Sequence, residues 1–365
     1  MAVDEDDIST LYESIVEVLT DECDSIALHK YYSGQSGLDE QLWARAAELG
    51  WTAIGLPQAQ GGLEMGVRGL TALFRALGRF AAPDIFLATL PAAQWLADMG
   101  DVSLCEQVLP GVITGEIQLA VPAAPDGAPI ALVDGKLTGV SPMLIGSPRA
   151  SIAILPTAGG FALMRMDTPE VTASSVEMWD RTRPMMTLRC DGAAPIAILS
   201  DPDGAAKGAL FRYLALAIAA DSVGGGQRIV AQTVEYLKTR EQFGRPLASF
   251  QALKHRVADL VFALESADES VKQGVEVTAA ADANAPLWVA IAKSAASEAY
   301  KMAAEDCLQL HGGVGYTWEF DCHIFLKRAL LNQTIAGDNR QHRDIAAEAL
   351  RAAAKAGIST AELAA

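Results

Sequence analysis

Residues 240–251 form the stretch REQFGRPLASFQ, and residues 309–316 form the stretch QLHGGVGY. Between them lie two apolar patterns at helical spacing, interrupted at residues 280–286 by AADANAP. A helix from about residue 250 to residue 278 would be about 45 Å long at 1.5 Å per residue. Because a second helix of similar length would bring the chain back, we expect Gln309 to lie beside Arg240 at one end of a helix bundle.

The residue types in these two stretches suit a pyrophosphate group. Arg240 offers a planar guanidinium that can donate two parallel hydrogen bonds. Gly312 and Gly313 allow a ligand to approach backbone N–H groups closely. The alternative interpretation is a polar bundle end at which glycines only terminate helices.

The two stretches also resemble the C-terminal domain of the acyl-CoA dehydrogenases, and a weaker resemblance covers nearly the whole chain. The resemblance implies a mainly α protein with a small β domain: an N-terminal helical domain, a middle β-barrel or sandwich, and a C-terminal four-helix bundle. It implies that both stretches hold the ADP half of FAD, and that they do so for the neighbouring subunit. The residues expected to contact FAD are Arg240, Gln242, Phe243, Gln251, Gln309, Leu310, Gly312 and Gly313.

The pattern along the chain predicts three domains, at residues 1–112, 113–203 and 204–365. The first and third show apolar residues at helical spacing, except that residues 51–57 are predicted to be extended. The glycines at 224–226 lie inside a helical pattern, which favours close packing against other helices. In the middle segment, short apolar runs alternate with Pro, Gly and Asp, and predict strands. These runs lie at 117–121, 130–133, 151–155, 161–166 and 196–199.

Composition limits the possible functions. The 365 residues are 51% hydrophobic and 20% charged, so the chain can bury a large core. A formal net charge of -17 argues against nonspecific binding to nucleic acid or to an anionic membrane. The five scattered cysteines contain no C-x-x-C pair, so we expect free thiols, a cytoplasmic location and no metal site. Acidic residues follow Met1 in place of a basic leader, and no apolar run has membrane-spanning length.

The resemblance implies α,β-dehydrogenation of an acyl-CoA thioester, in which a carboxylate removes the α-proton and FAD accepts the β-hydrogen. The commonest position of the family's base falls on Gly337, and a second known position falls on Leu214. Neither side chain can take a proton. Asp338, one residue from the first position, is the candidate base of this chain or, alternatively, the N-cap of a following helix. His342 and Arg343 are expected to be structural.

Side chains that contact the flavin ring in the family are also missing. Its Thr/Ser-Glu-Pro loop falls near residues 122–125, PAAP, and its Trp-x-Thr/Ser segment falls on residues 143–145, MLI. Neither segment contains a hydroxyl, an acid or a tryptophan. What remains is the part that a subunit gives to its neighbour's FAD, and what is lost is the part that it uses for its own.

These losses favour a heteromeric enzyme in which a partner subunit supplies the flavin pocket and a Glu base. Such a chain resembles the α2β2 acyl-CoA dehydrogenases that act on bulky steroid side-chain thioesters, with electron-transfer flavoprotein as the expected acceptor. One alternative is a self-sufficient homotetramer that uses Asp338. A second is a flavin-free, non-catalytic binding subunit, and a flavin oxidase on the same fold is a third.

Overall fold

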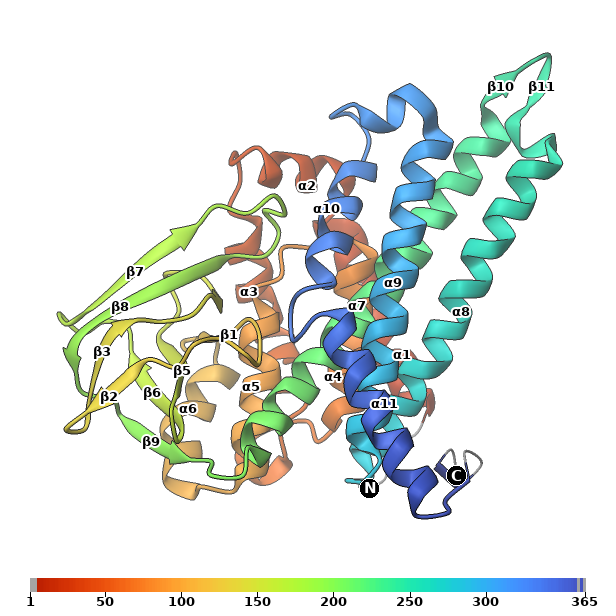
Figure 1. Cartoon of the computed structure of the whole chain (residues 1–365). Helices are drawn as coiled ribbons and strands as arrows, with labels where there is room; N and C mark the ends of the chain where they lie inside the picture. The colour runs from red at the N-terminus through yellow and green to blue at the C-terminus, as the bar shows by residue number, and fades with distance from the viewer. Residues whose placement is uncertain (1–4, 360–361, 364–365) are drawn as a thin grey trace. The chain divides into compact units, whose positions relative to one another are not determined.

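A computed structural model describes residues 5–359 and 362–363 of the chain (Figure 1). Its contacts divide the chain into two compact units. Unit 1 consists of Met1–Leu73 and Ala82–Ala217, and unit 2 of Phe74–Ala81 and Ile218–Ala365. The long helix α7 contributes residues to both.

The first helices agree with the apolar patterns. They are α1 (Glu5–Glu22), α2 (Ser25–Tyr32), α3 (Leu38–Glu48), α4 (Gly66–Arg79), α5 (Phe86–Met99) and α6 (Val102–Ile113). Ile15 and Leu19 of the predicted stripe are fully buried in α1. Helices give way to strands after Ile113 and resume at Ala205, but the contacts join the N-terminal helices and the sheet in one unit. The three predicted domain boundaries therefore stay a prediction.

The expected extended segment at residues 51–57 was wrong. It begins with a 3-10 turn, η1 (Trp51–Ala53), after Gly50 at φ +76°, and a second turn follows at η2 (Gln58–Gln60). The Thr52 hydroxyl donates a hydrogen bond to the Ile113 carbonyl at 2.8 Å, which ties the turn to the end of α6. The run is apolar because it is buried on all sides, and burial alone does not require a strand.

The strands of unit 1 form a single mixed sheet. They are β1 (Leu119–Pro122), β2 (Ala131–Val133), β3 (Lys136–Val140), β4 (Leu144–Ile145), β5 (Ile152–Thr157), β6 (Gly160–Arg165), β7 (Val171–Val176), β8 (Met185–Ala193) and β9 (Ala197–Ser200). Their order is β2-β3-β8-β4-β1-β5-β6-β9, with β7 paired to β8. The sheet has two halves, which meet at strand β1. This strand is antiparallel to β4 on one side and parallel to β5 on the other.

One hydrophobic core lies between the two halves of this sheet. Leu137 and Leu188 come from one half, and Leu155 and Met164 from the other, and all four are fully buried. The five predicted runs coincide with β1, β2, β5, β6 and β9, whereas β3, β4, β7 and β8 were not predicted. Strand β7, VTASSV, alternates between half-buried and exposed positions, so its sequence lacks the apolar run by which the others were found.

Unit 2 is a helix bundle that contains a long helical hairpin. Its main helices are α7 (Ala205–Thr239, from Ile218 onward), α8 (Gln251–Ala279), α9 (Ala285–His311), α10 (Cys322–Asn332) and α11 (Asn339–Lys355). Helices α8 and α9 lie side by side along their lengths (Figure 1). The reversal occurs at the predicted break, where Ala281 has φ +52° and the Asp282 side chain accepts a hydrogen bond from Asn284 N.

The glycines at 224–226 let α7 approach three other helices. A Cβ on Gly224 would lie 2.0 Å from the Arg75 carbonyl oxygen of α4. One on Gly225 would lie 2.6 Å from the Tyr300 ring of α9, and one on Gly226 would lie 2.4 Å from Leu264 of α8. Close packing explains these glycines, as the sequence pattern indicated.

Replacing Gly224 with alanine should destabilise the protein by about 1–3 kcal/mol, because the new methyl group overlaps a backbone oxygen that cannot rotate away. Helix propensity alone predicts the opposite sign, since alanine is better than glycine by about 1 kcal/mol. Gly208→Ala in the same helix is the control, because its Cβ meets only the flexible end of Arg212 at 3.3 Å. Urea unfolding of both variants tests this prediction, and equal shifts would contradict it.

Candidate functional site

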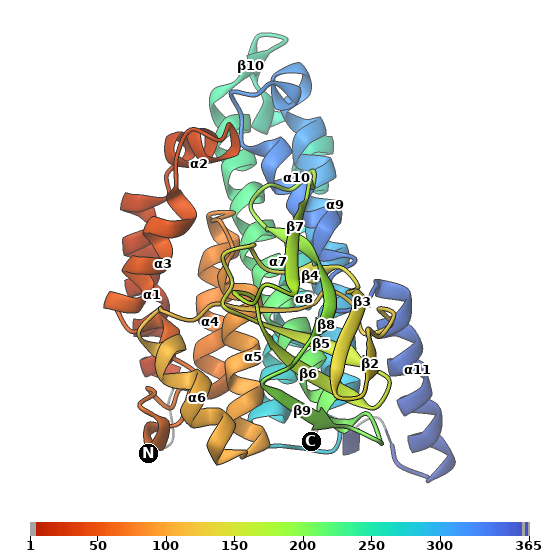
Figure 2. The same cartoon turned by 90° about the vertical axis from the view of Figure 1, so that its left-hand side faces the viewer.

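The two sequence stretches lie at the same end of unit 2. Tyr236, in the last turns of α7, stacks on His311 at the end of α9 with ring centroids 4.4 Å apart. The Tyr236 hydroxyl also donates to the His311 carbonyl at 3.3 Å. Arg240 follows one helical turn later, its N–H bonded to the Tyr236 carbonyl. Figures 1 and 2 both show the segment after α7 and the segment after α9 at this end.

The first stretch forms a small hairpin that the sequence did not predict. Strand β10 (Glu241–Gln242) pairs with β11 (Arg245–Pro246), and between them Phe243 and Gly244 have φ +56° and +77°. Two consecutive residues with positive φ are typical of the tight turn that matches strand twist. The turn holds the Phe243 side chain 88% exposed at the tip.

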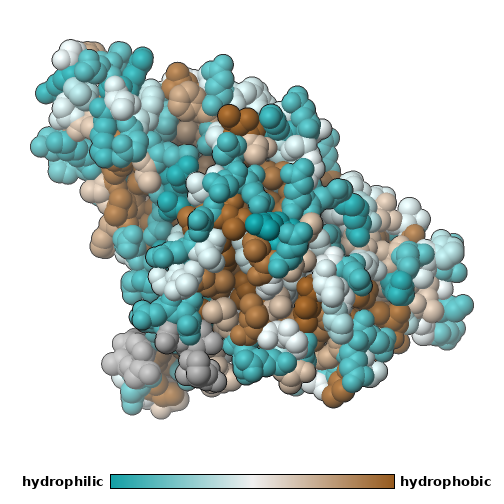
Figure 3. All heavy atoms as spheres, turned by 180° about the vertical axis from the view of Figure 1, so that it is seen from behind, coloured by the Kyte–Doolittle hydropathy of each residue, from teal (hydrophilic) through white to brown (hydrophobic). Residues whose placement is uncertain are grey.

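The rest of the first stretch is held close to this hairpin. The Arg245 guanidinium lies 4.0 Å from the centre of the Phe250 ring, a cation–π contact. A short turn, η3 (Leu247–Ser249), leads to Gln251, the first residue of α8. Hydrophilic side chains cover most of this end of the bundle in the view of Figure 3.

The second stretch presents open backbone. Helix α9 ends at His311, and η4 (Gly312–Tyr316) follows. The C-cap residue Gly312 has a φ of 63° and a ψ of -145°, which suit glycine alone. No atom of the described residues lies within 4 Å of a Cβ built on Gly312 or Gly313. Gly315 differs, because its Cβ would meet the Leu308 carbonyl oxygen at 2.6 Å. Gly315 is therefore required for packing, whereas the two preceding glycines leave room for a ligand.

Most of the predicted contact residues are exposed on the isolated chain. The side chains of Arg240, Gln242, Gln251 and Gln309 are exposed, and Leu310 is half-buried. Within residues 5–359 and 362–363, no hydrogen bond or ion pair engages the Arg240 guanidinium. The exposed guanidinium lies at the same end of the bundle as the open glycine backbone and can bind a phosphate without breaking existing contacts.

The expected base positions carry no ionisable group. Gly337 has φ +99°, which L side chains rarely adopt, and its Cβ would lie 3.2 Å from both Gln341 Oε1 and His342 Nε2. Leu214 is fully buried in α7. The backbone at Gly337 thus disfavours any side chain, including a glutamate.

Asp338 caps α11. Its Oδ1 accepts a hydrogen bond from Gln341 N at 2.7 Å, and Gln341 Oε1 accepts one from Asp338 N at 2.9 Å. This reciprocal capping box satisfies two N–H groups at the start of the helix. The structure therefore has the N-cap arrangement that the sequence offered as the alternative to a base.

The two segments at which the flavin-ring contacts were expected, residues 122–125 and 143–145, are neighbours in the sheet of unit 1. Pro122 pairs with Leu144, and Ala123 N donates to the Met143 carbonyl at 2.9 Å. Leu144 and Ile145 point into the core, at 0% and 1% exposure. The segments therefore offer backbone groups and apolar side chains only.

Comparison with known proteins identifies the family. The model of the acyl-CoA dehydrogenase N-terminal domain matches residues 5–116, and that of the C-terminal domain matches residues 204–351. The acyl-CoA dehydrogenase IpdE2 of Mycobacterium tuberculosis is 31% identical over 325 residues, which cover 87% of this chain and 89% of the relative. The chain belongs to the acyl-CoA dehydrogenase family.

Two solved structures of acyl-CoA dehydrogenases extend this comparison. A variant of the Tcur3481-Tcur3483 steroid ACAD is 25% identical with a TM-score of 0.84, over 96% of this chain and 99% of that one. The ChsE4-ChsE5 complex from Mycobacterium tuberculosis is 24% identical with a TM-score of 0.86, over 96% and 98%. Together they show the acyl-CoA dehydrogenase fold across nearly the whole chain. The family consists of oxidoreductases that act on acyl-CoA.

Two buried polar residues beside the family's base position were missed by sequence reasoning or treated as merely structural. Lys293 lies in α9 and His342 in α11, at 0% and 6% exposure. The available signal was a single lysine within the apolar face of α9, between Ala292 and Ser294. Periodicity predicts that such a position is buried, and a buried lysine requires acceptors.

The two cysteines of unit 2, Cys307 and Cys322, are buried free thiols that pack near this end of the bundle. Cys322 Sγ lies 3.5 Å from His311 Nδ1, which also bonds the Cys307 carbonyl. Burial raises the pKa of Cys322 to about 11 and that of Cys307 to about 12. Both thiols are therefore protonated at neutral pH, and a thiol is a poor metal ligand or nucleophile.

His342 should make the stability of this acyl-CoA dehydrogenase depend on acidity. Burial, and then the charge of Lys293, lowers the pKa of His342 to about 4. Between its ordinary pKa of about 6.5 and this value, the unfolded chain binds a proton that the folded chain does not, so stability falls as pH falls. The largest loss is about 3 kcal/mol, from about 1.4 kcal/mol per pKa unit.

Urea unfolding between pH 7 and pH 4.5 measures this effect. His342→Gln keeps an N–H donor for the Ala336 carbonyl, which His342 Nε2 contacts at 3.0 Å, and should flatten the profile. His255→Gln on the exposed face of α8 is the matched control and should keep the wild-type profile. A profile in His342→Gln as steep as the wild type would refute the assignment.

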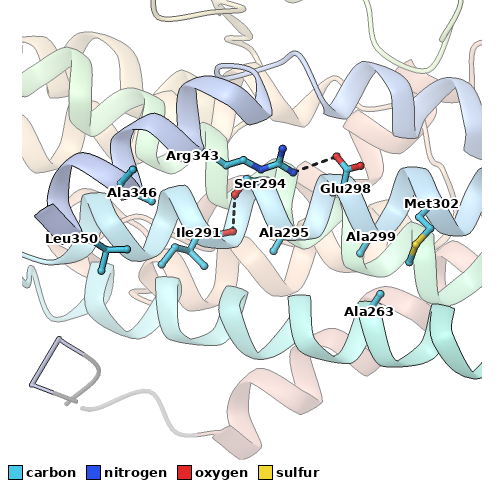
Figure 4. A pocket seen from close by; sticks show the side chains of 11 residues that line it. Ala263, Ile291, Ser294, Ala295, Glu298, Ala299, Met302, Arg343, Ala346 and Leu350 are labelled. Carbon is cyan, nitrogen blue, oxygen red and sulfur yellow. Dashed lines mark hydrogen bonds and ion pairs between the residues drawn. The ribbon is translucent and has the colours of Figure 1, made fainter. Parts of the chain in front are cut away.

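An apolar groove of about 500 Å³ runs along α8, α9 and α11 (Figure 4). Alanines and Ile291, Met302 and Leu350 line it, and the pair of Arg343 and Glu298 lies at its edge. The residues expected to bind the cofactor do not line this groove. None of the described helices is long and apolar enough to cross a membrane.

Proposed function

We propose that this chain is one subunit of a heteromeric, FAD-dependent acyl-CoA dehydrogenase, and that it supplies the ADP-half site to a partner subunit carrying the flavin ring pocket and the base. One observation supports the proposal. Arg240 and Gly312 lie at one exposed end of the bundle, whereas the residues at the two expected base positions, Gly337 and Leu214, cannot take a proton.

The residues present suit the ADP half of FAD. Arg240 would pair with the pyrophosphate, and the open backbone at Gly312 and Gly313 would approach it. Gln242, Phe243, Gln251, Gln309 and Leu310 would flank the nucleotide. When bound, FAD supplies the acceptor for the β-hydrogen, while the chain's own contribution is binding and orientation.

The comparisons support a partner and a bulky substrate. The ChsE4-ChsE5 structure is a complex of two named chains, and the Tcur3481-Tcur3483 protein is a steroid ACAD. We therefore propose a steroid side-chain acyl-CoA as the substrate class and electron-transfer flavoprotein as the acceptor. If the ring pocket of this subunit holds no flavin, the vacant space could admit part of a polycyclic acyl group.

The flavin absorbance of the purified chain tests this function. The chain is expressed alone and together with a second acyl-CoA dehydrogenase subunit that carries a Glu base, and flavin is quantified per subunit. A colourless single chain and about one FAD per heterodimer are expected, since each shared site needs both subunits. One FAD per subunit in the single chain, bleached by acyl-CoA, would favour the homotetramer with Asp338 as the base. A complex without flavin would favour the non-catalytic subunit.

A further inference from the structure

Lys293 places a fully buried ammonium against the loop that contains the family's base position. Its Nζ donates to the Gln333 carbonyl at 3.0 Å and to the Gly337 carbonyl at 2.6 Å. A third, longer contact of 3.4 Å reaches Asn339 Oδ1. The protonated group has three N–H donors, one for each contact, and the neutral amine has two, enough for the two carbonyls.

His342 holds the same loop from α11. Its Nε2 lies 3.0 Å from the Ala336 carbonyl, so this nitrogen must carry the proton. Ala336 and Gly337 have φ +60° and +99°, and the left-handed conformation of a residue with a Cβ costs roughly 1–2 kcal/mol. Three loop carbonyls therefore accept hydrogen bonds from side chains of the flanking helices, and these bonds offset the strain of the turn.

The titratable groups close to Lys293 lie on α11 and on α9 itself. Asp338, at the start of α11, raises the pKa of Lys293, and the buried His342 faces it from the same helix. On α9, Glu298 accepts a hydrogen bond from Asn339 Nδ2 at 3.1 Å and lies 3.6 Å from Arg343 Nη2 (Figure 4). Glu298 is thus bound by Asn339 and Arg343. Burial is the largest cause of the lowered pKa of Lys293.

We propose that Lys293 is a positioning residue, which fixes the loop at residues 333–338 so that the family's base position presents backbone in place of a side chain. The assignment of this loop to the catalytic pocket rests on the proposed function. Both the residue type at position 337 and the main-chain conformation there then disfavour a base. The same contact fixes the start of α11, where Asp338 lies.

The proposal couples loop opening to pH. Burial lowers the pKa of Lys293 to about 7 in the closed loop. When the loop opens to water, the pKa returns to about 10.4, so above pH 7 the open state binds more protons than the closed state. Raising the pH should therefore make opening rarer, by up to about tenfold per pH unit.

Hydrogen exchange of the full chain at pH 7 and pH 9, corrected for the intrinsic exchange rate, measures this opening. The informative amides are Thr334 and Ile335, which bond the Leu331 carbonyl, and Asp338, which bonds Gln341 Oε1. In the wild type, opening should become about 50-fold rarer over these two pH units, because the closed group is already half deprotonated at pH 7.

Two variants identify the responsible group. Lys293→Met should open more often and lose the pH dependence. Lys301 lies on the same helix, is partly exposed and pairs with Glu305. Lys301→Met should therefore keep the wild-type dependence of loop opening on pH. Constant opening in the wild type, or an unchanged pH response in Lys293→Met, would overturn the proposal. If Lys293→Met does not fold, the wild type and Lys301→Met decide alone, since loss of the response in Lys301→Met would also overturn it.

This experiment is independent of flavin. A complex without FAD would refute the shared-site function and leave the exchange result unaffected. Conversely, a loop without pH dependence would refute the role of Lys293 while one FAD per heterodimer still supported the shared site.

Discussion

Arg240→Ala should weaken FAD binding by the proposed heteromeric complex about 10- to 100-fold, because a charge-assisted hydrogen bond to phosphate contributes about 1.5–3 kcal/mol. The chain itself should stay as stable as the wild type. Across the described residues the guanidinium makes no hydrogen bond or ion pair, and the side chain is exposed. Titration of the apo-complex with FAD measures affinity, and urea unfolding of the single chain measures stability.

Two further variants separate the guanidinium from a general loss of positive charge. Lys238→Ala removes an exposed cation two residues earlier, one that already pairs with Glu235 at 2.6 Å. FAD affinity should change little in this variant. Arg240→Lys keeps the charge but loses the bidentate fork, so its affinity should lie between the wild type and Arg240→Ala. Equal FAD affinity in wild type and Arg240→Ala would exclude the pyrophosphate role.

Arg328→Met should destabilise the protein by about 3–5 kcal/mol, because it leaves a buried carboxylate without its arginine. Arg328 and Asp221 are both fully buried, and Arg328 Nε donates to Asp221 Oδ2 at 3.1 Å. Asn332 Nδ2 donates to the other carboxylate oxygen at 2.8 Å. This network connects α7 to α10, immediately before the loop at residues 333–338.

The double variant Asp221→Leu/Arg328→Met is the informative control. Replacing a buried ion pair by apolar residues of similar volume is often close to neutral, whereas breaking it is costly. Urea unfolding should therefore show that the double variant regains much of the stability lost in Arg328→Met. Losses that simply add in the double variant would show that packing, and not the unpaired charge, causes the effect.

Local sequence predicted much of the bundle and of the end at which the two glycine-bearing stretches lie. The helical hairpin between residues 250 and 311 follows from apolar periodicity and from one break, and α8 and α9 have the expected positions. Periodicity works for these helices because each buries one side and exposes the other. Periodicity fails for β7, which has no fully buried position, and for residues 51–57, most of which are buried without alternation.

In the candidate site, too, local sequence predicted some features and not others. The sequence placed Arg240 and Gly312 in polar, glycine-bearing stretches, and their exposure agrees with that pattern. It could not place the tight turn at Phe243, because a positive φ at a residue with a Cβ depends on the strand pairing around it. Nor could it choose between the two roles of Asp338, since a cap and a base use the same side chain in different surroundings.

The sequence by itself determined the family, the helical hairpin and the absence of an ionisable side chain at residues 214 and 337. Only the tertiary structure showed that α7 approaches three helices through its glycines, that Asp338 caps α11, and that Lys293 is buried against the loop. The physical reason is the distance along the chain over which each feature is encoded. Side-chain chemistry and periodicity are encoded locally, whereas the contacts of the α7 glycines and of Lys293 join distant parts of the chain and depend on how the helices pack. The choice between cap and base at Asp338 depends on the conformation that the backbone takes around it.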